Sequence, residues 1–166
     1  MTTEHSQTYR SFLDRKAQLD GASGFEPSWL PEFLFPFQAA LVEWAVRQGR
    51  AALFADCGLG KTPMQLVWAE NVRRRTGRPV LIATPLAVSY QTEIEAQKFG
   101  IDAATSRDGR LTAGITITNY ERLHLFERAQ LGGMSCDGPS ARQACAGARP
   151  KSAADCLARK PSRWFW

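Results

Sequence analysis

Apolar positions in the first half of the chain alternate between helical spacing and short continuous runs. Pro36 can open a helix and Gly49 can end one, and between them apolar residues recur at helical spacing, namely Phe37, Ala40, Leu41, Trp44 and Ala45. The apolar run 51–55 then predicts a strand that is buried on both faces. A second helix is expected from about Lys61 to Gly77, with an inner face made of Met64, Val67, Trp68 and Val72.

The second half of the chain continues this alternation. Residues 79–84 form a β-branched run that predicts a buried strand, and residues 86–99 predict a helix in which Leu86, Tyr90 and Ile94 lie four apart. A weaker signal follows for a strand at 101–105. Residues 114–119, with their β-branched side chains, predict a clear strand, and Tyr120–Phe126 predicts a short helix. Helices alternating with strands are typical of an α/β domain with a largely parallel sheet flanked by helices.

Charge and composition divide the chain into three parts. Residues 1–30 are polar with Gly and Pro breaks and are expected to form an N-terminal arm, while 31–137 hold the predicted domain. Residues 1–137 carry 15 Lys and Arg against 15 Asp and Glu, so the net charge of +5 comes from the tail 138–166, which has six basic residues and one acid. Of the 29 tail residues, 15 are Ala, Gly, Pro or Ser, a composition that predicts disorder.

The location of the protein can be inferred from what the chain does not contain. The polar start has no apolar stretch like that of a signal peptide, and no apolar run approaches the ~20 residues that cross a bilayer. The four cysteines include no Cys-x-x-Cys pair, which argues against a zinc site and favours reduced thiols. We therefore expect a cytoplasmic protein with no membrane partner.

The strongest chemical signal is the segment Ala55-Asp-Cys-Gly-Leu-Gly-Lys-Thr62, between an apolar run and a helix. Glycines in such a loop let backbone N–H groups turn inward and bind phosphate oxygens, and the helix N-terminus adds unpaired N–H groups. Lys61 would reach the β- and γ-phosphates, and the Thr62 hydroxyl would ligate Mg²⁺. Ala55 stands where such loops usually begin with Gly. The alternative is a glycine-rich turn with a chance Lys-Thr pair.

The stretch Asp56–Thr62 resembles motif I of Swi/Snf-type helicases and translocases of superfamily two, and looks most like compact phage and prophage members. Three weaker matches follow the order of that family. Phe35–Gln38 resembles the aromatic and Gln element that recognises adenine, Thr84–Ser89 resembles motif Ia, and Ile115–Leu123 resembles the segment with motif Ib. The resemblance covers about residues 30–137 and implies a RecA-like P-loop domain that uses ATP, Mg²⁺ and DNA.

The resemblance also implies roles for individual residues. ATP would be bound by Gln38 at adenine and by the loop residues Asp56, Cys57, Gly58, Leu59, Gly60, Lys61 and Thr62. DNA would be contacted by Thr84, Pro85, Asn119 and Tyr120. Each has a plainer alternative. Gln38 could lie on an exposed helix face, Thr84 and Pro85 could simply close a strand, and Asn119 and Tyr120 could be a turn residue and a core aromatic.

The likeness ends at motif II, where the family has Asp-Glu. Asp137 lies at the place of the Asp, which would hold Mg²⁺ and act in catalysis with Lys61, but Gly138 stands where the Glu would orient water. The composition changes at the same residue. We therefore interpret the RecA-like lobe as incomplete and the tail as an out-of-frame end. The alternative is an authentic basic tail. Without the Glu and a second RecA-like lobe, this chain is expected to be inactive alone.

Two other functions stay open at the sequence level. A P-loop kinase or phosphotransferase fits the length, but not the order of the four motifs. A non-enzymatic nucleic-acid binder acting through the basic tail is the other, and it predicts salt-sensitive DNA binding that does not depend on Lys61. The sequence leaves the oligomeric state open.

Overall fold

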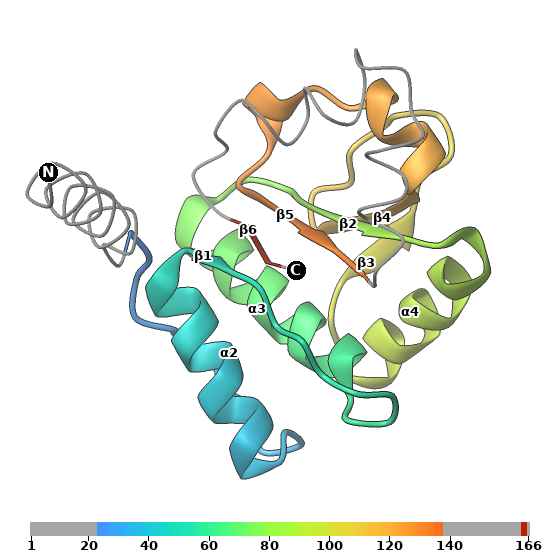
Figure 1. Ribbon diagram of the computed structural model, residues 1–166. Helices are drawn as coiled ribbons and strands as arrows, with labels where there is room; N and C mark the ends of the chain where they lie inside the picture. The colour runs from blue at the N-terminus through green and yellow to red at the C-terminus, as the bar shows by residue number, and fades with distance from the viewer. Residues whose placement is uncertain (1–22, 138–163, 166) are drawn as a thin grey trace, which may run out of the picture.

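The computed structural model describes residues 23–137 and the backbone of Trp164–Phe165. Six parallel strands form one sheet in the order β1-β6-β5-β2-β4-β3 (Figure 1). The strands are β1 (Arg50–Ala51), β2 (Val80–Thr84), β3 (Ala103–Thr105), β4 (Ile115–Asn119), β5 (Gly133–Cys136) and β6 (Trp164–Phe165). The helices are α2 (Pro36–Gln48), α3 (Lys61–Thr76), α4 (Leu86–Lys98) and the 3₁₀ turns η1 (Tyr120–Leu125) and η2 (Arg128–Gln130). The predicted α/β fold with a parallel sheet is confirmed.

The sheet separates two apolar layers because successive side chains of a strand point to opposite faces. Val80 and Ile82 of β2 pack in the larger cluster with the three α-helices, whereas Leu81 and Ala83 pack in the smaller one with η1. Figure 1 shows α2, α3 and α4 on one side of the sheet and the 3₁₀ turns on the other. The sheet is therefore covered on both faces, as parallel sheets require.

Helix α3 lies at the centre of the helical layer and is buried almost all round. The predicted inner face is confirmed, since Met64, Val67, Trp68 and Val72 are each at most 1% exposed. Polar residues of α3 are buried as well, and Gln65 donates from Nε2 to the Ser135 hydroxyl at 2.6 Å. This bond ties the helix that follows the phosphate loop to β5, the strand that leads to Asp137.

Helices α2 and α4 have the predicted spans but present different faces to the core. In α2 the buried residues are Gln38, Val42, Ala45 and Val46, while Phe37 and Trp44 are 45% exposed. In α4 the regularly spaced Leu86, Tyr90 and Ile94 face outward, and the buried residues are Ser89, Thr92 and Ala96. The apolar spacing therefore identified both helices correctly but not their buried sides.

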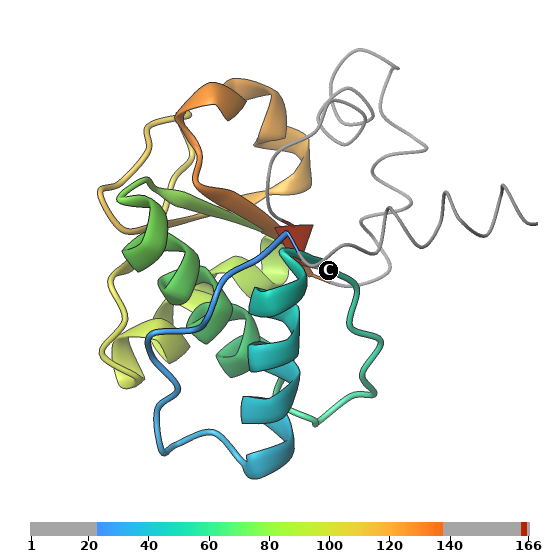
Figure 2. The same ribbon diagram turned by 90° about the vertical axis from the view of Figure 1, so that its left-hand side faces the viewer.

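The strand expected over 51–55 is much shorter than predicted. β1 ends at Ala51, and Phe54 is 97% exposed. Figure 2 shows the chain after β1 running out as a wide loop before α3 begins. The physical reason is the neighbour: β1 pairs with β6, which is itself only two residues long, so the ladder can hold no more than two pairs.

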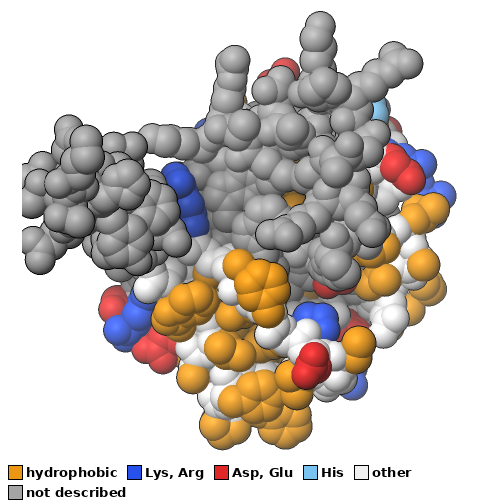
Figure 3. All heavy atoms as spheres, viewed as in Figure 1, with side chains coloured by type: hydrophobic (Ala, Val, Ile, Leu, Met, Phe, Trp, Pro, Cys, Tyr) orange, Lys and Arg blue, Asp and Glu red, His pale blue; other side chains and the backbone are white. Residues whose placement is uncertain are grey.

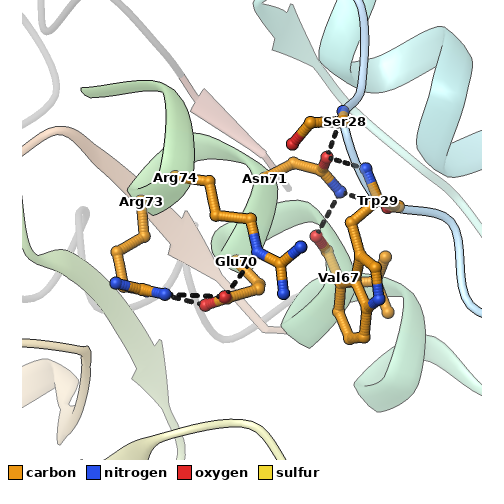
Figure 4. Close-up of polar contacts among 7 residues, drawn as sticks. All are labelled: Ser28, Trp29, Val67, Glu70, Asn71, Arg73 and Arg74. Atoms are coloured by element: carbon orange, nitrogen blue, oxygen red, sulfur yellow. Dashed lines mark hydrogen bonds and ion pairs between the residues drawn. The ribbon is translucent and has the colours of Figure 1, made fainter. Parts of the chain in front are cut away.

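The N-terminal segment is fixed to α3 by one buried amide (Figure 4). Asn71 Oδ1 accepts from the backbone N–H groups of Ser28 and Trp29 at 2.9 and 3.0 Å, and its Nδ2 donates to the carbonyls of Trp29 and Val67. The neighbouring Glu70 accepts from Arg73 and Arg74. Burial alone would raise the pKa of Glu70, but those two guanidinium groups lower it overall.

Several sequence predictions fall outside the described residues. These are the arm up to residue 22 and the disorder expected for 138–163 and 166. Trp164 and Phe165, at the end of that tail, form β6 between β1 and β5, a place that suits the high strand propensity of aromatic residues. Within the described part of the chain, no helix combines the length and the apolar character that a bilayer crossing demands.

Candidate functional site

The loop between β1 and α3 has the backbone that its glycines predict. Gly58 and Gly60 have φ angles of 83° and 72°, in the left-handed region that favours glycine. A Cβ on Gly60 would lie 2.3 Å from Nε2 of Gln38, so this position also needs the absence of a side chain. The four loop residues before Gly60, namely Asp56, Cys57, Gly58 and Leu59, are all exposed. The loop is thus open to a ligand on its outer side.

Lys61, the first residue of α3, folds its side chain back across this loop. Its Nζ donates to the carbonyls of Ala55 and Asp56 at 3.0 and 2.9 Å. The side chain is half-buried, and the bond to Asp56 lies at the exposed surface. The ammonium is therefore held at the mouth of the loop by two neutral carbonyls, which an anion can displace. Thr62, the next residue, is also half-buried.

Gln38 is joined to the same loop from α2. Its Nε2 donates to the Leu59 carbonyl at 2.9 Å, and its Oε1 accepts from the Phe35 N–H at 3.0 Å. The side chain is 4% exposed, so the alternative of a polar residue on an exposed helix face is wrong. The structure thus brings Gln38 together with the glycine-rich loop, through Leu59, which lies 21 residues further along the chain.

Asp137 follows β5, and its carboxyl lies near enough to Lys61 for the lysine charge to act on its pKa. Burial raises the pKa of its carboxyl above the usual range, and the Lys61 ammonium opposes this rise. The backbone of Asp137 is fixed on both sides, because its N–H donates to Ala83 at 2.9 Å and its carbonyl accepts from the Tyr120 hydroxyl. A carboxylate so placed can share a Mg²⁺ ion with phosphate oxygens, the usual way in which proteins hold this ion.

The raised pKa of Asp137 gives a prediction for Asp137→Asn. We expect this variant to melt at a slightly higher temperature than the parent protein at pH 7, because it removes a charge from a partly buried place. If Asp137 is the Mg²⁺ ligand that its place in the sequence predicts, the gain in ATP affinity that Mg²⁺ provides should fall about tenfold, roughly 1.4 kcal/mol, in this variant. Thermal melting and calorimetric titration with and without Mg²⁺ measure the two effects.

The pH dependence of that stability difference has a definite sign. The folded-state pKa of Asp137 lies above that of the unfolded chain. Its contribution to stability is therefore full at pH values below the unfolded pKa, and it is lost as the pH rises through the folded pKa. The variant and the parent protein should therefore converge in melting temperature as the pH is lowered to about 4. If the melting temperature of the parent protein rose relative to that of the variant as the pH was raised, the raised pKa of Asp137 would be contradicted.

The residues expected to contact nucleic acid lie at the carboxyl ends of two paired strands. Thr84 of β2 is in register with Asn119 of β4, and both side chains are at most 4% exposed. Among the described residues, neither the Thr84 hydroxyl nor Asn119 Oδ1 has a hydrogen-bond partner. Pro85 and Tyr120 follow them, and the hydroxyl of Tyr120 donates to Asp137. One edge of the sheet therefore carries both these residues and Asp137.

Sequence reasoning missed a group of basic and aromatic residues beside Asn119. Arg107 follows β3, Arg122 lies in η1 after β4, and Tyr90 lies on α4, and all three line one cavity with Asn119. The signal that could have found the arginines is their position, because residues that follow parallel strands gather at one edge of the sheet.

Exposed aromatic and apolar side chains accompany the phosphate loop. Phe35 and Phe37 are 65% and 45% exposed and have nearly parallel rings with centroids 6.2 Å apart, while Phe54 lies on the loop itself. Figure 3 shows hydrophobic side chains gathered over the lower part of this face, where α2 begins and the loop runs. Exposed aromatic rings beside a glycine-rich loop are groups on which a nucleobase could stack.

Comparisons with known proteins identify solved structures that share this fold. No protein-family model matches the sequence, and no curated protein matches it significantly. The SWI2/SNF2 ATPase core of Sulfolobus solfataricus, solved in complex with dsDNA, has a TM-score of 0.57 and 23% identity over 72% of this chain and 28% of its own. The UvsW helicase of bacteriophage T4 has a TM-score of 0.62 and 17% identity over 95% of this chain and 58% of its own.

This chain therefore spans between about a quarter and three fifths of these two solved proteins. At such identities the likeness concerns the fold. The chain has the α/β fold of the RecA-like domains found in helicases.

Proposed function

We propose that this chain is the ATP-binding N-terminal lobe of an ATP-dependent DNA helicase or translocase of superfamily two. The observation that carries the proposal is the position of the Lys61 ammonium, held by two loop carbonyls at the mouth of a glycine-rich loop. Two residues from other elements meet this group, as a nucleotide site of this type requires. Gln38 is bonded to the loop, and the charge of Lys61 acts on the pKa of Asp137.

The geometry suggests how ATP would be held. The N–H groups of the loop and of the first turn of α3 would bind the phosphate oxygens. The Lys61 ammonium would exchange its two carbonyl partners for the β- and γ-phosphates. Thr62 and Asp137 would hold the Mg²⁺ that accompanies the phosphates. Gln38 would contact the adenine edge while it keeps its bond to Leu59.

DNA is the proposed polymer partner. Thr84, Pro85, Asn119 and Tyr120 would contact it, and the buried unpartnered atoms of Thr84 and Asn119 support a ligand at this edge. We further propose a phage-type origin and the truncation inferred from the sequence. Gly138 in place of Glu leaves no carboxylate to orient water beside Asp137, so hydrolysis by these 166 residues should be slow.

Titration of the purified chain with ATP in the presence and absence of Mg²⁺ tests the nucleotide site, and phosphate release with and without DNA tests the chemistry. We expect Mg²⁺-dependent ATP binding with negligible DNA-stimulated release. Robust DNA-stimulated turnover would contradict the role given to Gly138, and absence of ATP binding would contradict the site.

Two further measurements separate this proposal from its competitors. Transfer of the γ-phosphate to a small acceptor would identify a kinase or phosphotransferase instead. DNA binding that survives Lys61→Ala but vanishes when the six basic residues within 138–163 are replaced by Gln, with β6 kept, would identify the basic tail as the binding element.

A further inference from the structure

A cavity of about 630 Å³ lies beside the carboxyl ends of β3 and β4, and no residue of the phosphate loop lines it. One wall comes from the first half of α4, with Leu86 and Tyr90. The other lining residues come from the end of β3 and the loop after it, over 105–108 with Arg110 and Thr112, and from Asn119 and Arg122. The volume is in the range of pockets that hold small ligands. A ligand the size of one nucleotide would fit.

The charges of the cavity favour an anion. Three arginines line it, Arg107, Arg110 and Arg122, against two acids. Asp108 pairs with Arg110 at 3.3 Å. Glu93 accepts from the neutral Thr105 hydroxyl at 2.7 Å and keeps its charge, so three arginines against two acids leave the lining with a net charge of +1. Within residues 23–137, neither Arg107 nor Arg122 forms an ion pair. Two guanidinium groups thus remain for a phosphodiester, which they recognise well.

A phosphodiester alone would leave one group of the cavity unsatisfied. Asn119 is 4% exposed, and its Nδ2 donates to the Glu121 carboxylate at 2.8 Å, which fixes the orientation of the amide. The other end, Oδ1, has no partner in the described part of the chain. A carbonyl oxygen needs a donor, and a phosphodiester has none. The edge of every nucleobase carries at least one N–H group in its unpaired form.

The rim of the cavity provides a surface on which a base can stack. Tyr90 is 72% exposed and Leu86 is 61% exposed, one helical turn apart on α4. Exposed aromatic rings beside a basic groove are the usual stacking platforms for single-stranded nucleic acid. A base within a duplex cannot use such a platform, because its faces are covered by its neighbours and its edge is paired.

We infer that this cavity binds one unpaired nucleotide of a DNA strand, with its phosphate on Arg107 and Arg122, its base on Tyr90 and its edge on Asn119. The inference rests on the proposed function for its partner, DNA, and adds the class of DNA. The preferred substrate is DNA that contains a single-stranded stretch, and blunt duplex is bound less well.

Fluorescence anisotropy of the full chain at about 150 mM salt tests this with labelled oligonucleotides. Three probes of equal length are compared: a single strand, the blunt duplex of that strand, and an abasic strand that keeps the phosphates. We expect the single strand to bind about tenfold or more tightly than the duplex. Tyr90→Ala should weaken the single strand about fivefold or more and leave the abasic strand unchanged, while Tyr90→Phe should retain near-parent affinity.

Arginine variants complete the test. Arg107→Ala should weaken the single strand and the abasic strand alike, because it acts on phosphate. Arg75→Ala removes the same charge from an exposed place at the far end of α3, so it should change neither. Circular dichroism checks that each variant is folded.

The outcomes distinguish the inference from the proposed function. Equal affinity for single strand and duplex, or a Tyr90→Ala effect that is the same on the abasic strand, would overturn the inference while DNA remained a partner. A folded chain that binds ATP but none of the three probes would overturn both the inference and the choice of DNA.

Discussion

Replacing Lys61 with alanine is expected to weaken ATP binding by about 10- to 100-fold and to leave the fold intact. A hydrogen bond to a charged group contributes about 1.5–3 kcal/mol, and each 1.4 kcal/mol is a factor of ten in affinity. The variant also loses two bonds to loop carbonyls, but one of these lies at the surface, where water can replace it. Titration calorimetry with Mg²⁺ and ATP measures the affinity, and circular dichroism follows the fold.

Lys98→Ala is the matched control for this variant, since Lys98 is an exposed lysine at the end of α4. It should bind ATP as the parent protein does. A second readout needs no ligand: the Lys61 charge lowers the pKa of Asp137, so Lys61→Ala should raise that pKa further, as NMR titration of the carboxyl carbon can measure. Unchanged ATP affinity in a folded Lys61→Ala protein would remove the basis of the nucleotide site.

The sequence predicted elements well where local signals agree with one another. β2 and β4 are rich in β-branched residues, and α2 and α3 end at Gly49 and Gly77, whose backbones have the positive φ of helix-ending glycines. Such signals need no knowledge of distant residues. The run 51–55 misled because its apolar composition cannot reveal how long the neighbouring strand is.

The orientation of α4 shows a second limit of sequence reasoning. Its regularly spaced apolar residues face solvent, and Ser89 and Thr92 are buried instead. These hydroxyls donate to the carbonyls of Leu86 and Val88 within the same helix, at 2.7 and 3.0 Å. A hydroxyl that is satisfied by its own helix can be buried at little cost, so hydrophobicity alone does not identify the inner face. The outward face then supplies Leu86 and Tyr90 to the cavity.

The candidate site was predictable in its residues but not in its contacts. The glycine-rich loop and its lysine follow from the spacing of the motif, whereas the bond between Gln38 and Leu59 depends on how α2 packs on α3. The basic cavity depends on α4, the end of β3 with the loop after it, the end of β4 and η1, which meet only in the folded chain. The roles given to the loop, to Gln38 and to Asp137 stay predictions.

Asn71→Ala should lower the free energy of unfolding by about 3 kcal/mol. This is a large share of the ~5–15 kcal/mol by which folded domains are usually stable. Asn71 is fully buried, and its side chain holds Ser28 and Trp29, which lie more than 40 residues away in the chain. Truncation removes four hydrogen bonds, three of them part-buried and one buried, and a polar group left buried without a partner costs about 1–3 kcal/mol. Urea unfolding followed by circular dichroism measures the loss.

Gln91→Ala is the matched control, because it truncates an exposed amide whose one described bond, to Glu95, is 3.3 Å long. Its effect on the free energy of unfolding should stay within about 0.5 kcal/mol, as for most surface substitutions.

The loss of structure in Asn71→Ala should also be local. The segment 27–30 should become sensitive to proteases before the sheet unfolds, since its polar ties to α3 run through this amide and the Arg74 contact over the Trp29 ring, whereas residues 23–26 are also held by the end of α2. Asn71→Ala could instead have the same free energy of unfolding as the parent protein, and its N-terminal segment could lose protection from proteases only when the sheet unfolds. In that case Asn71 would not be the residue that anchors the segment.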